Sequence, residues 1–138
     1  MDKQKLMKLA VKWYPEKKLA HAVRVATYAA DQPFIDEETA DSLWAIGLMH
    51  DILEDTPLTY QQLNETKLLN SLELEAIQIL THHKEDCPYD EYIRSIAEEG
   101  NLFAIVVKRC DMKDHLMLKD TLTEKLQNKY FPVIKYLL

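Results

Sequence analysis

The sequence predicts an all-α protein with a single domain. Only two glycines and five prolines interrupt its 138 residues, so few positions break a regular element. Leu, Ala, Lys and Glu dominate the composition, and these residues favour helices over strands. Apolar residues recur at helical spacing along much of the chain, as in helices that bury one face. With 47% hydrophobic residues, the length suits one compact domain spanning residues 1–138.

Charge and cysteine content exclude several classes of protein. Seventeen basic against twenty-three acidic residues give a net charge of -6, which opposes bulk binding to nucleic acid or to an anionic membrane. A phosphorylated ligand would therefore need a local basic pocket. Cys87 and Cys110 are too few for a disulfide scaffold and suit a reducing cytosol. Because no long apolar segment or signal-peptide pattern is present, we expect a cytoplasmic protein.

The first two predicted helices cover residues 2–14 and 16–31 and are separated by Pro15. The second is rich in Ala and Val, and we expect it to be central and nearly buried. Its polar exceptions share one stripe: Lys17, His21, Arg24 and Tyr28. A single histidine there would more often be a hydrogen-bonded core residue than a ligand. Two flanking cations would be costly on a buried helix unless they faced a cavity that holds anions.

Capping residues predict the next three helices. Asp36 suits the N-cap of a helix that leads through Gly47 to residue 55 and ends before Pro57. Gly47 would let a neighbouring helix approach closely. Two capping boxes follow, Thr59 with Gln62 and Asn70 with Glu73. The helix after the second box should run to residue 83. His82, His83 and Lys84 would then either complement its C-terminal dipole or have a functional role.

Two further helices are predicted after Pro88. The first should end at Gly100, and we assign most of its aromatic residues to packing. Residues 102–107 are all apolar, which a buried strand would also explain. We favour a helix because no partner strand is evident and because a helix places Lys108, Asp111 and His115 on one face. The alternative for Lys108 and Asp111 is an ion pair on a surface turn.

A last helix is predicted over residues 121–138. Thr121 with Glu124 forms its capping pattern, and Pro132 should break or kink it. Its apolar residues would dock on the core or on a second subunit: Leu122, Leu126, Val133 and Leu137. The sequence therefore leaves open a monomer or a homodimer.

The segment HDILED at residues 50–55 is the centre of the predicted site. His50 and Asp51 offer a nitrogen and an oxygen ligand, a mixture that suits a divalent transition metal ion. On a continuous helix, Glu54 would project from the same face and bind or orient a metal-bound water. A solvated acidic helix end is the alternative, but clustered acids oppose the dipole and repel one another without a cation.

The order of histidines and aspartates along the helices resembles a known family. His21, then His50 with Asp51, then Asp111 follow the ligand order of the HD-domain superfamily of metal-dependent phosphohydrolases. Residues 50–56, HDILEDT, are similar to the HDxxEDT signature of the RelA/SpoT-type alarmone hydrolases and their small single-domain relatives. YDEYI at 89–93 and VKRCD at 107–111, which is similar to the family's VKLAD, support the match. The resemblance covers residues 16–118.

This resemblance implies an all-helical hydrolase that acts on a phosphorylated small molecule. His21, His50, Asp51 and Asp111 would bind one divalent ion, manganese in the best-known members, with zinc, iron, cobalt and magnesium as other candidates. Glu54 and Asp55 would position and activate the attacking water. The cations we place near substrate phosphates are Lys17, Arg24, Lys84, Lys108 and Arg109, with His115 also in the substrate pocket.

The chain departs from the alarmone hydrolases in the substrate pocket. Ala22 stands where the family has a proline after the first histidine. Met112 stands in place of the arginine after Asp111, and His115 stands in place of the asparagine that would contact the sugar. We expect hydrolysis of a nucleotide or a related metabolite, with guanosine 3'-diphosphate (ppGpp) hydrolysis as the leading case. The alternatives are a nucleoside monophosphate phosphatase and a metal-containing module that senses nucleotides or binds protein without turnover.

Overall fold

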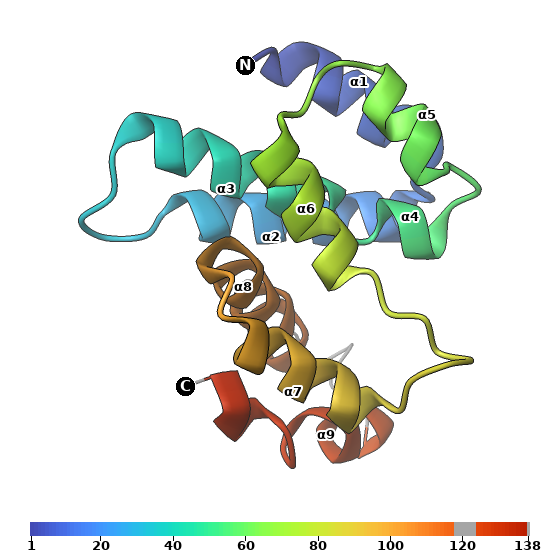
Figure 1. The fold of residues 1–138 in the computed structure, drawn as a ribbon, viewed down its shortest axis with the longest axis vertical. Helices are drawn as coiled ribbons and strands as arrows, with labels where there is room; N and C mark the ends of the chain where they lie inside the picture. The colour runs from blue at the N-terminus through green and yellow to red at the C-terminus, as the bar shows by residue number, and fades with distance from the viewer. Residues whose placement is uncertain (118–123, 138) are drawn as a thin grey trace.

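The computed structural model describes residues 1–117 and 124–137, and every regular element within these ranges is a helix (Figure 1). The predicted all-α fold is confirmed. In the described part of the chain, no helix is both long enough and apolar enough to cross a membrane.

Three N-terminal helices follow the predicted order: α1 (Lys3–Trp13), α2 (Glu16–Ala30) and α3 (Glu37–Met49). Asp36 caps α3 by accepting a hydrogen bond from the Thr39 amide at 2.8 Å. Helix α2 packs along α3, and a Cβ atom on Gly47 would lie 2.8 Å from the Cα of Ala26. The predicted close approach at Gly47 is therefore confirmed. Helix α2 is central but not nearly buried, because one face, including Ala20, is exposed.

The backbone bends after α3, so residues 36–55 do not form one helix. Helix α3 ends at Met49, and the short helix α4 (Ile52–Asp55) begins after Asp51, whose φ of -103° and ψ of -1° leave the regular helical path. The prediction of a continuous helix was wrong here. The carbonyl of Gly47 accepts a 2.6 Å hydrogen bond from the His50 imidazole, a side-chain competitor for the helical hydrogen bonds.

Both predicted capping boxes are present, at the starts of α5 (Tyr60–Glu65) and α6 (Ser71–Leu80). Helix α6 ends at Leu80, three residues earlier than predicted, because Thr81 adopts an extended conformation with ψ of 113°. His82 and His83 therefore lie in the following loop and not in the last helical turn. The prediction that α6 runs to residue 83 was wrong.

The C-terminal half contains α7 (Tyr89–Glu99), α8 (Leu102–Met117), α9 (Glu124–Tyr130) and the 3-10 helix η1 (Ile134–Leu137). Gly100 caps α7 in the left-handed region with φ of 71°, and α8 is the predicted helix, not a strand. Pro132 separates α9 from η1. Within the described residues, the C-terminal segment packs on α7 and α8 of its own chain. Thr121 and Leu122 lie outside the described residues.

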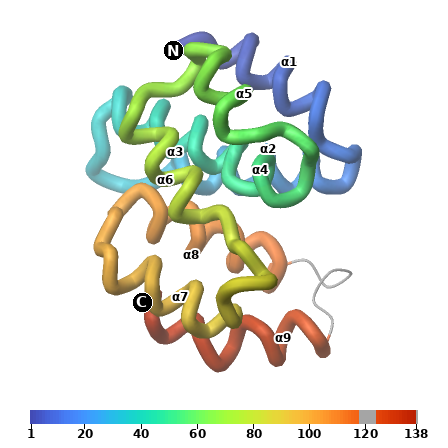
Figure 2. The backbone as a smooth tube through the Cα atoms, turned by 45° about the vertical axis from the view of Figure 1, so that its right-hand side comes forward, coloured from blue at the N-terminus to red at the C-terminus, as the bar shows by residue number. Residues whose placement is uncertain are grey.

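Helix α8 connects the two ends of the molecule. Helices α1 to α6 gather at one end and α7, α9 and η1 at the other, while α8 packs against α2, α3 and α6 (Figure 2). One apolar core joins them, with fully buried members from six helices: Leu6, Ala26, Ile46, Ile77, Ile93 and Met112. The polar residues of α2, α3 and α8 that face one another inside this core define the candidate site.

Candidate metal centre and its cavity

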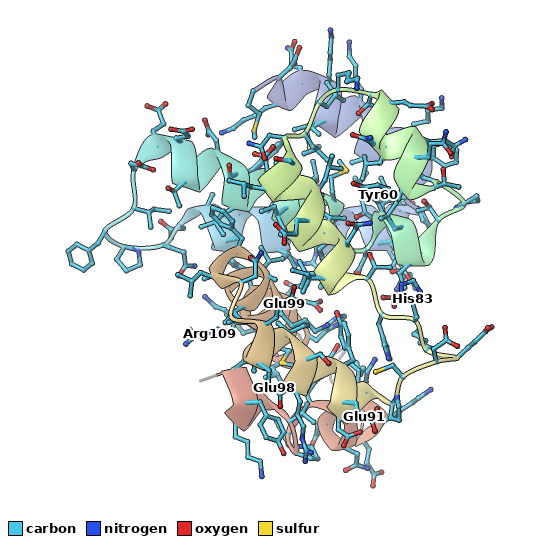
Figure 3. All side chains as sticks on the ribbon, viewed as in Figure 1. Tyr60, His83, Glu91, Glu98, Glu99 and Arg109 are labelled. Atoms are coloured by element: carbon cyan, nitrogen blue, oxygen red, sulfur yellow. The ribbon has the colours of Figure 1, made fainter. Side chains whose placement is uncertain are left out.

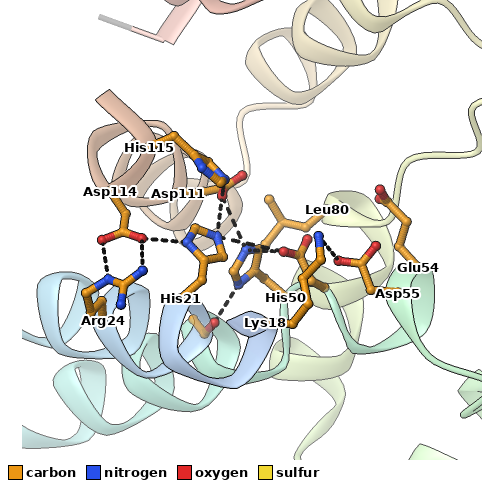
Figure 4. A network of polar contacts seen from close by, with 12 residues as sticks. Lys18, His21, Arg24, His50, Glu54, Asp55, Leu80, Asp111, Asp114 and His115 are labelled. Carbon is orange, nitrogen blue, oxygen red and sulfur yellow. Dashed lines mark hydrogen bonds and ion pairs between the residues drawn. The ribbon is translucent and has the colours of Figure 1, made fainter. Parts of the chain in front are cut away.

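Four side chains from three segments meet between α2, the end of α3 and α8. They are His21, His50, Asp51 and Asp111, and one ligand atom from each lies within 4.8 Å of all the others. Figure 4 labels His21, His50 and Asp111 in this cluster. His21, His50 and Asp111 are buried, and Asp51 is partly exposed. The arrangement could hold a metal ion, and it brings together all four ligands that the sequence predicted.

The orientation of His50 leaves one ring nitrogen aimed into the cluster. Its Nδ1–H donates to the Gly47 carbonyl at 2.6 Å. Its Nε2 lies 3.1 Å from Asp51 Oδ2 and 3.5 Å from Asp111 Oδ1, yet it is buried without a hydrogen-bond partner among the described residues. A buried polar atom without a partner is costly. A cation held between this nitrogen and the two carboxylates would resolve that cost, so the residues fit a metal ion.

His21 is held in the matching orientation by a residue that the sequence analysis missed. Asp114 accepts a hydrogen bond from His21 Nδ1 at 2.6 Å, while His21 Nε2 lies 2.8 Å from Asp111 Oδ1. Arg24 donates to the two Asp114 oxygens at 2.7 and 3.1 Å. Carboxylates that bind the second nitrogen of a metal-bound histidine fix the ring and raise its basicity. Arg24, Asp114 and His21 thus form a chain that ends at the cluster (Figure 4).

The charges of the metal-free cluster are strongly coupled. Burial alone would lower the pKa of His50, but the carboxylates of Asp51 and Asp111 outweigh it and raise this pKa well above the usual value. Burial would raise the pKa of Asp111, but the Lys108 charge and the two histidines hold it well below its usual range. The Lys108 ammonium lies 2.7 Å from Asp111 Oδ2. This ion pair is buried on a helix, not on a surface turn as the alternative prediction had it.

Glu54 and Asp55 lie on the wall beside the cluster, each held by a specific partner. Glu54 Oε1 accepts a 2.8 Å hydrogen bond from the backbone amide of His82, and Glu54 Oε2 lies 3.7 Å from the Lys84 ammonium. Asp55 Oδ2 lies 3.3 Å from the Lys18 ammonium. Because of the bend at residues 50–51, Glu54 reaches the site from α4 and not from a continuation of α3.

These groups surround a cavity of about 160 Å³. Its charged lining combines four lysines with four acids: Lys18, Lys84, Lys108, Lys129, Asp51, Glu54, Asp55 and Asp111. Histidines and aromatic residues complete most of the wall: His82, His115, Tyr89, Tyr92 and Tyr130. The volume is below the 300–1,000 Å³ of typical small-molecule pockets, so it would enclose only one end of a nucleotide-sized ligand.

Three of the predicted phosphate-binding cations do not reach this cavity. Lys17 is exposed, and the neighbouring Lys18 points to the site instead. Arg109 is exposed and labelled on the outer side of the molecule in Figure 3, where it lines other surface hollows. Arg24 is committed to Asp114. Helical phase explains the errors at Lys17 and Arg109, because a shift of one residue turns a side chain by about 100°.

The remaining predicted substrate-site residues, Lys84, Lys108 and His115, do line the cavity. The His115 ring stacks on His21 with centroids 4.4 Å apart. Sequence analysis missed Lys18, Asp114, His82 and Lys129, and it assigned Tyr89 and Tyr92 to packing. Lys18 and Asp114 could have been found, since each lies three residues from a predicted ligand on the same helix. Lys129 offered no such signal.

Neither the known protein families nor the curated proteins compared with this chain give a match to its sequence. The assignment of a function therefore depends on the site itself.

Proposed function

We propose that this chain is an HD-type, metal-dependent phosphohydrolase that acts on a nucleotide or a related phosphorylated metabolite. The observation that carries this proposal is the position of the His21, His50, Asp51 and Asp111 cluster, which borders a cavity lined by lysines and by the Glu54–Asp55 pair. A cation site next to paired carboxylates and ammonium groups is suited to attack of water on a phosphoryl group.

Two imidazole nitrogens and two carboxylate oxygens suit a divalent transition ion. The resemblance to the HD-domain hydrolases favours manganese, with zinc, iron, cobalt and magnesium as the other candidates. When bound, such an ion lowers the pKa of a coordinated water and neutralises charge on a phosphoryl oxygen.

Side chains of the protein would accept the proton, orient the water and bind the phosphate. Glu54, fixed by the His82 amide, is the proposed acceptor for the proton of the attacking water, and Asp55 orients that water. Lys84 and Lys18, which already contact these two carboxylates, lie where they can also bind phosphate oxygens. Lys108 is buried against Asp111 and holds this ligand in place.

The leading specific reaction is removal of diphosphate from the 3' position of a guanosine nucleotide. It follows from the HDILEDT segment, while Met112 and His115 mark a substrate pocket that differs from that of the alarmone hydrolases. We place the protein in the cytoplasm, in keeping with its two free cysteines, Cys87 and Cys110.

Metal analysis and product identification test the proposal. Purified protein should contain a divalent ion and, with added manganese, release diphosphate from ppGpp within a nucleotide panel. Glu54→Ala should abolish release and keep the metal, whereas Glu85→Ala, on an exposed loop residue, should retain both. Orthophosphate release from nucleoside monophosphates would instead favour a nucleotidase. Bound metal without turnover of any substrate would contradict the enzyme proposal and favour a sensing or protein-binding module.

A further inference from the structure

Two buried side-chain polar atoms among the described residues have no hydrogen-bond partner, and both belong to residues at this site. One is His50 Nε2, for which a metal ion accounts; the other is the hydroxyl oxygen of Tyr89. Tyr89 is the first residue of α7 and lines the cavity. Buried hydroxyl groups without an acceptor are rare in folded proteins, and each calls for an explanation.

Two ammonium groups approach the ring of Tyr89. The Lys129 ammonium lies 4.4 Å from the centroid of its ring, and the Lys108 ammonium lies 5.5 Å from it. Neither ammonium can accept a hydrogen bond from the hydroxyl. Burial raises the pKa of Tyr89 to about 12, despite the nearby Lys108 charge, so the group stays a hydrogen-bond donor at neutral pH. The hydroxyl therefore lacks an acceptor, and an anion would supply one.

Lys129 differs from the other lysines of the cavity. Lys18, Lys84 and Lys108 each contact a carboxylate at 3.3, 3.7 and 2.7 Å, whereas Lys129 forms no ion pair with any described residue. It is half-buried, and burial together with the Lys108 and Lys84 charges lowers its pKa. A half-buried cation near two others, without an ion pair to a described carboxylate, would be stabilised by an anion beside it.

We propose that Tyr89 and Lys129 form a second phosphoryl subsite, which binds the phosphoryl group of the ligand that lies farther from the metal cluster. Lys108 lies between the two positions, because its ammonium contacts Asp111 on one side and approaches the Tyr89 ring on the other. With a divalent cation bound, the ion and the four lysines carry six positive charges against the four negative charges of the acids, so the cavity favours a ligand with more than one negative charge.

The subsite assigns a role to the C-terminal segment. Lys129 and Tyr130 belong to α9, which is joined to α8 through residues 118–123, so the cavity wall depends on the docking of α9. The inference rests on the proposed function only in naming the anion as a phosphoryl group. A ligand with two linked phosphoryl groups would contact the cluster with one and Tyr89 with the other.

Calorimetric titration of the metal-loaded protein with inorganic diphosphate and with inorganic phosphate tests this subsite. Tyr89→Phe keeps the ring and removes the hydroxyl, and should weaken diphosphate binding about tenfold or more, as expected for a hydrogen bond to a charged acceptor. Lys129→Gln should weaken it by roughly the same factor. Phosphate alone can occupy the metal cluster, so its affinity should change little. Metal content should equal that of the unchanged protein in both variants.

Matched controls are Tyr60→Phe, on an exposed tyrosine outside the cavity, and Lys125→Gln, on an exposed lysine of the same helix α9. Unchanged diphosphate affinity in Tyr89→Phe would overturn the inference, and so would equal weakening of phosphate binding or loss of metal. If Tyr89→Phe weakens diphosphate binding but the protein turns over no substrate, the subsite is supported and the proposed function is refuted. If the protein turns over substrate but its diphosphate affinity does not depend on Tyr89, the proposed function is supported and the subsite is refuted.

Discussion

Asp114 accepts a hydrogen bond from His21 Nδ1 at 2.6 Å, and this contact turns the opposite ring nitrogen toward Asp111. Asp114 is itself buried and fixed by two hydrogen bonds from Arg24. Asp114 and Arg24 therefore form a layer of support on α2 and α8 behind the four candidate metal ligands.

Replacing Asp114 by Asn should weaken divalent metal binding by about 10–100-fold, the usual cost of altering a carboxylate that supports a histidine ligand. The side chain keeps its size, but the charge that stabilises the His21 ring is lost. Calorimetric titration with manganese measures the change in affinity. Asp90→Asn removes an exposed acid from α7 and should leave the affinity as it was. Equal affinities in the two variants would contradict the support role.

Divalent metal should stabilise the fold, because the cluster joins α2, the end of α3 and α8. At a manganese concentration of about 100 times Kd, the free energy of unfolding should rise by about 2.7 kcal/mol. Thermal melts with and without metal would show the shift. His50→Ala should remove it, whereas His83→Ala, on an exposed residue, should keep it. A shift that survived in His50→Ala would place the bound metal elsewhere.

The contact between α2 and α3 should tolerate no side chain at residue 47. Gly47→Ala places a Cβ atom 2.8 Å from the backbone of Ala26, and backbone cannot move aside as a flexible side chain can. We expect a loss of about 1–3 kcal/mol in the free energy of unfolding. Urea denaturation measures this free energy. The control is Ala20→Ser, on the exposed face of α2, whose free energy of unfolding should stay within about 0.5 kcal/mol of that of the unchanged protein.

Local sequence signals were sufficient for most of the fold. Helix caps form between residues three positions apart, as at Asp36 and at the pair Asn70 and Glu73, so the sequence alone can reveal them. The end of α6 was misplaced because nothing in the sequence at 81–83 forbids another helical turn. The bend at residue 50 was missed for a related reason, since it involves a side chain that bonds to the backbone of Gly47.

In the candidate site, the sequence likewise predicted some residues and missed others. His21, His50, Asp51 and Asp111 were found because their order and residue types restrict the chemistry even without coordinates. The cations were harder, since their position depends on the helical phase, as with Lys17 and Lys18, or on the packing of a distant segment. Lys129 reaches the cavity only because α9 docks beside α7 and α8, a contact that no local pattern encodes.

The two cysteines should differ in reactivity. Burial raises the pKa of the Cys110 thiol, so less of it is the reactive thiolate at neutral pH, while Cys87 is more accessible. Iodoacetamide at pH 7.5 should therefore modify Cys87 well before Cys110 in the folded protein, as peptide mass spectrometry would reveal. Unfolding in urea should equalise the two rates. Faster labelling of Cys110 in the native state would contradict its burial.

His82 should control the position of Glu54 through the backbone of the loop after α6. Its ring stacks on Tyr92 with centroids 4.4 Å apart, and its Nε2 bonds to the Cys87 carbonyl at 2.7 Å. These contacts hold the His82 amide that donates to Glu54. His82→Ala should therefore loosen the loop without removing any metal ligand.

Hydrogen exchange measures this effect independently of turnover. In His82→Ala, amides of residues 81–87 should exchange faster, and the amide of residue 82 should lose the protection that its bond to Glu54 gives. Metal content should be unchanged, and any phosphohydrolase activity should fall through kcat more than through KM, because Glu54 would be misplaced for proton transfer. His83→Ala changes the next, exposed histidine of the same loop and should alter neither exchange at residue 82 nor kcat. Equal exchange in the two variants would show that the ring of His82 does not hold the loop, and the position of Glu54 would then depend on its other contact, the Lys84 ammonium at 3.7 Å.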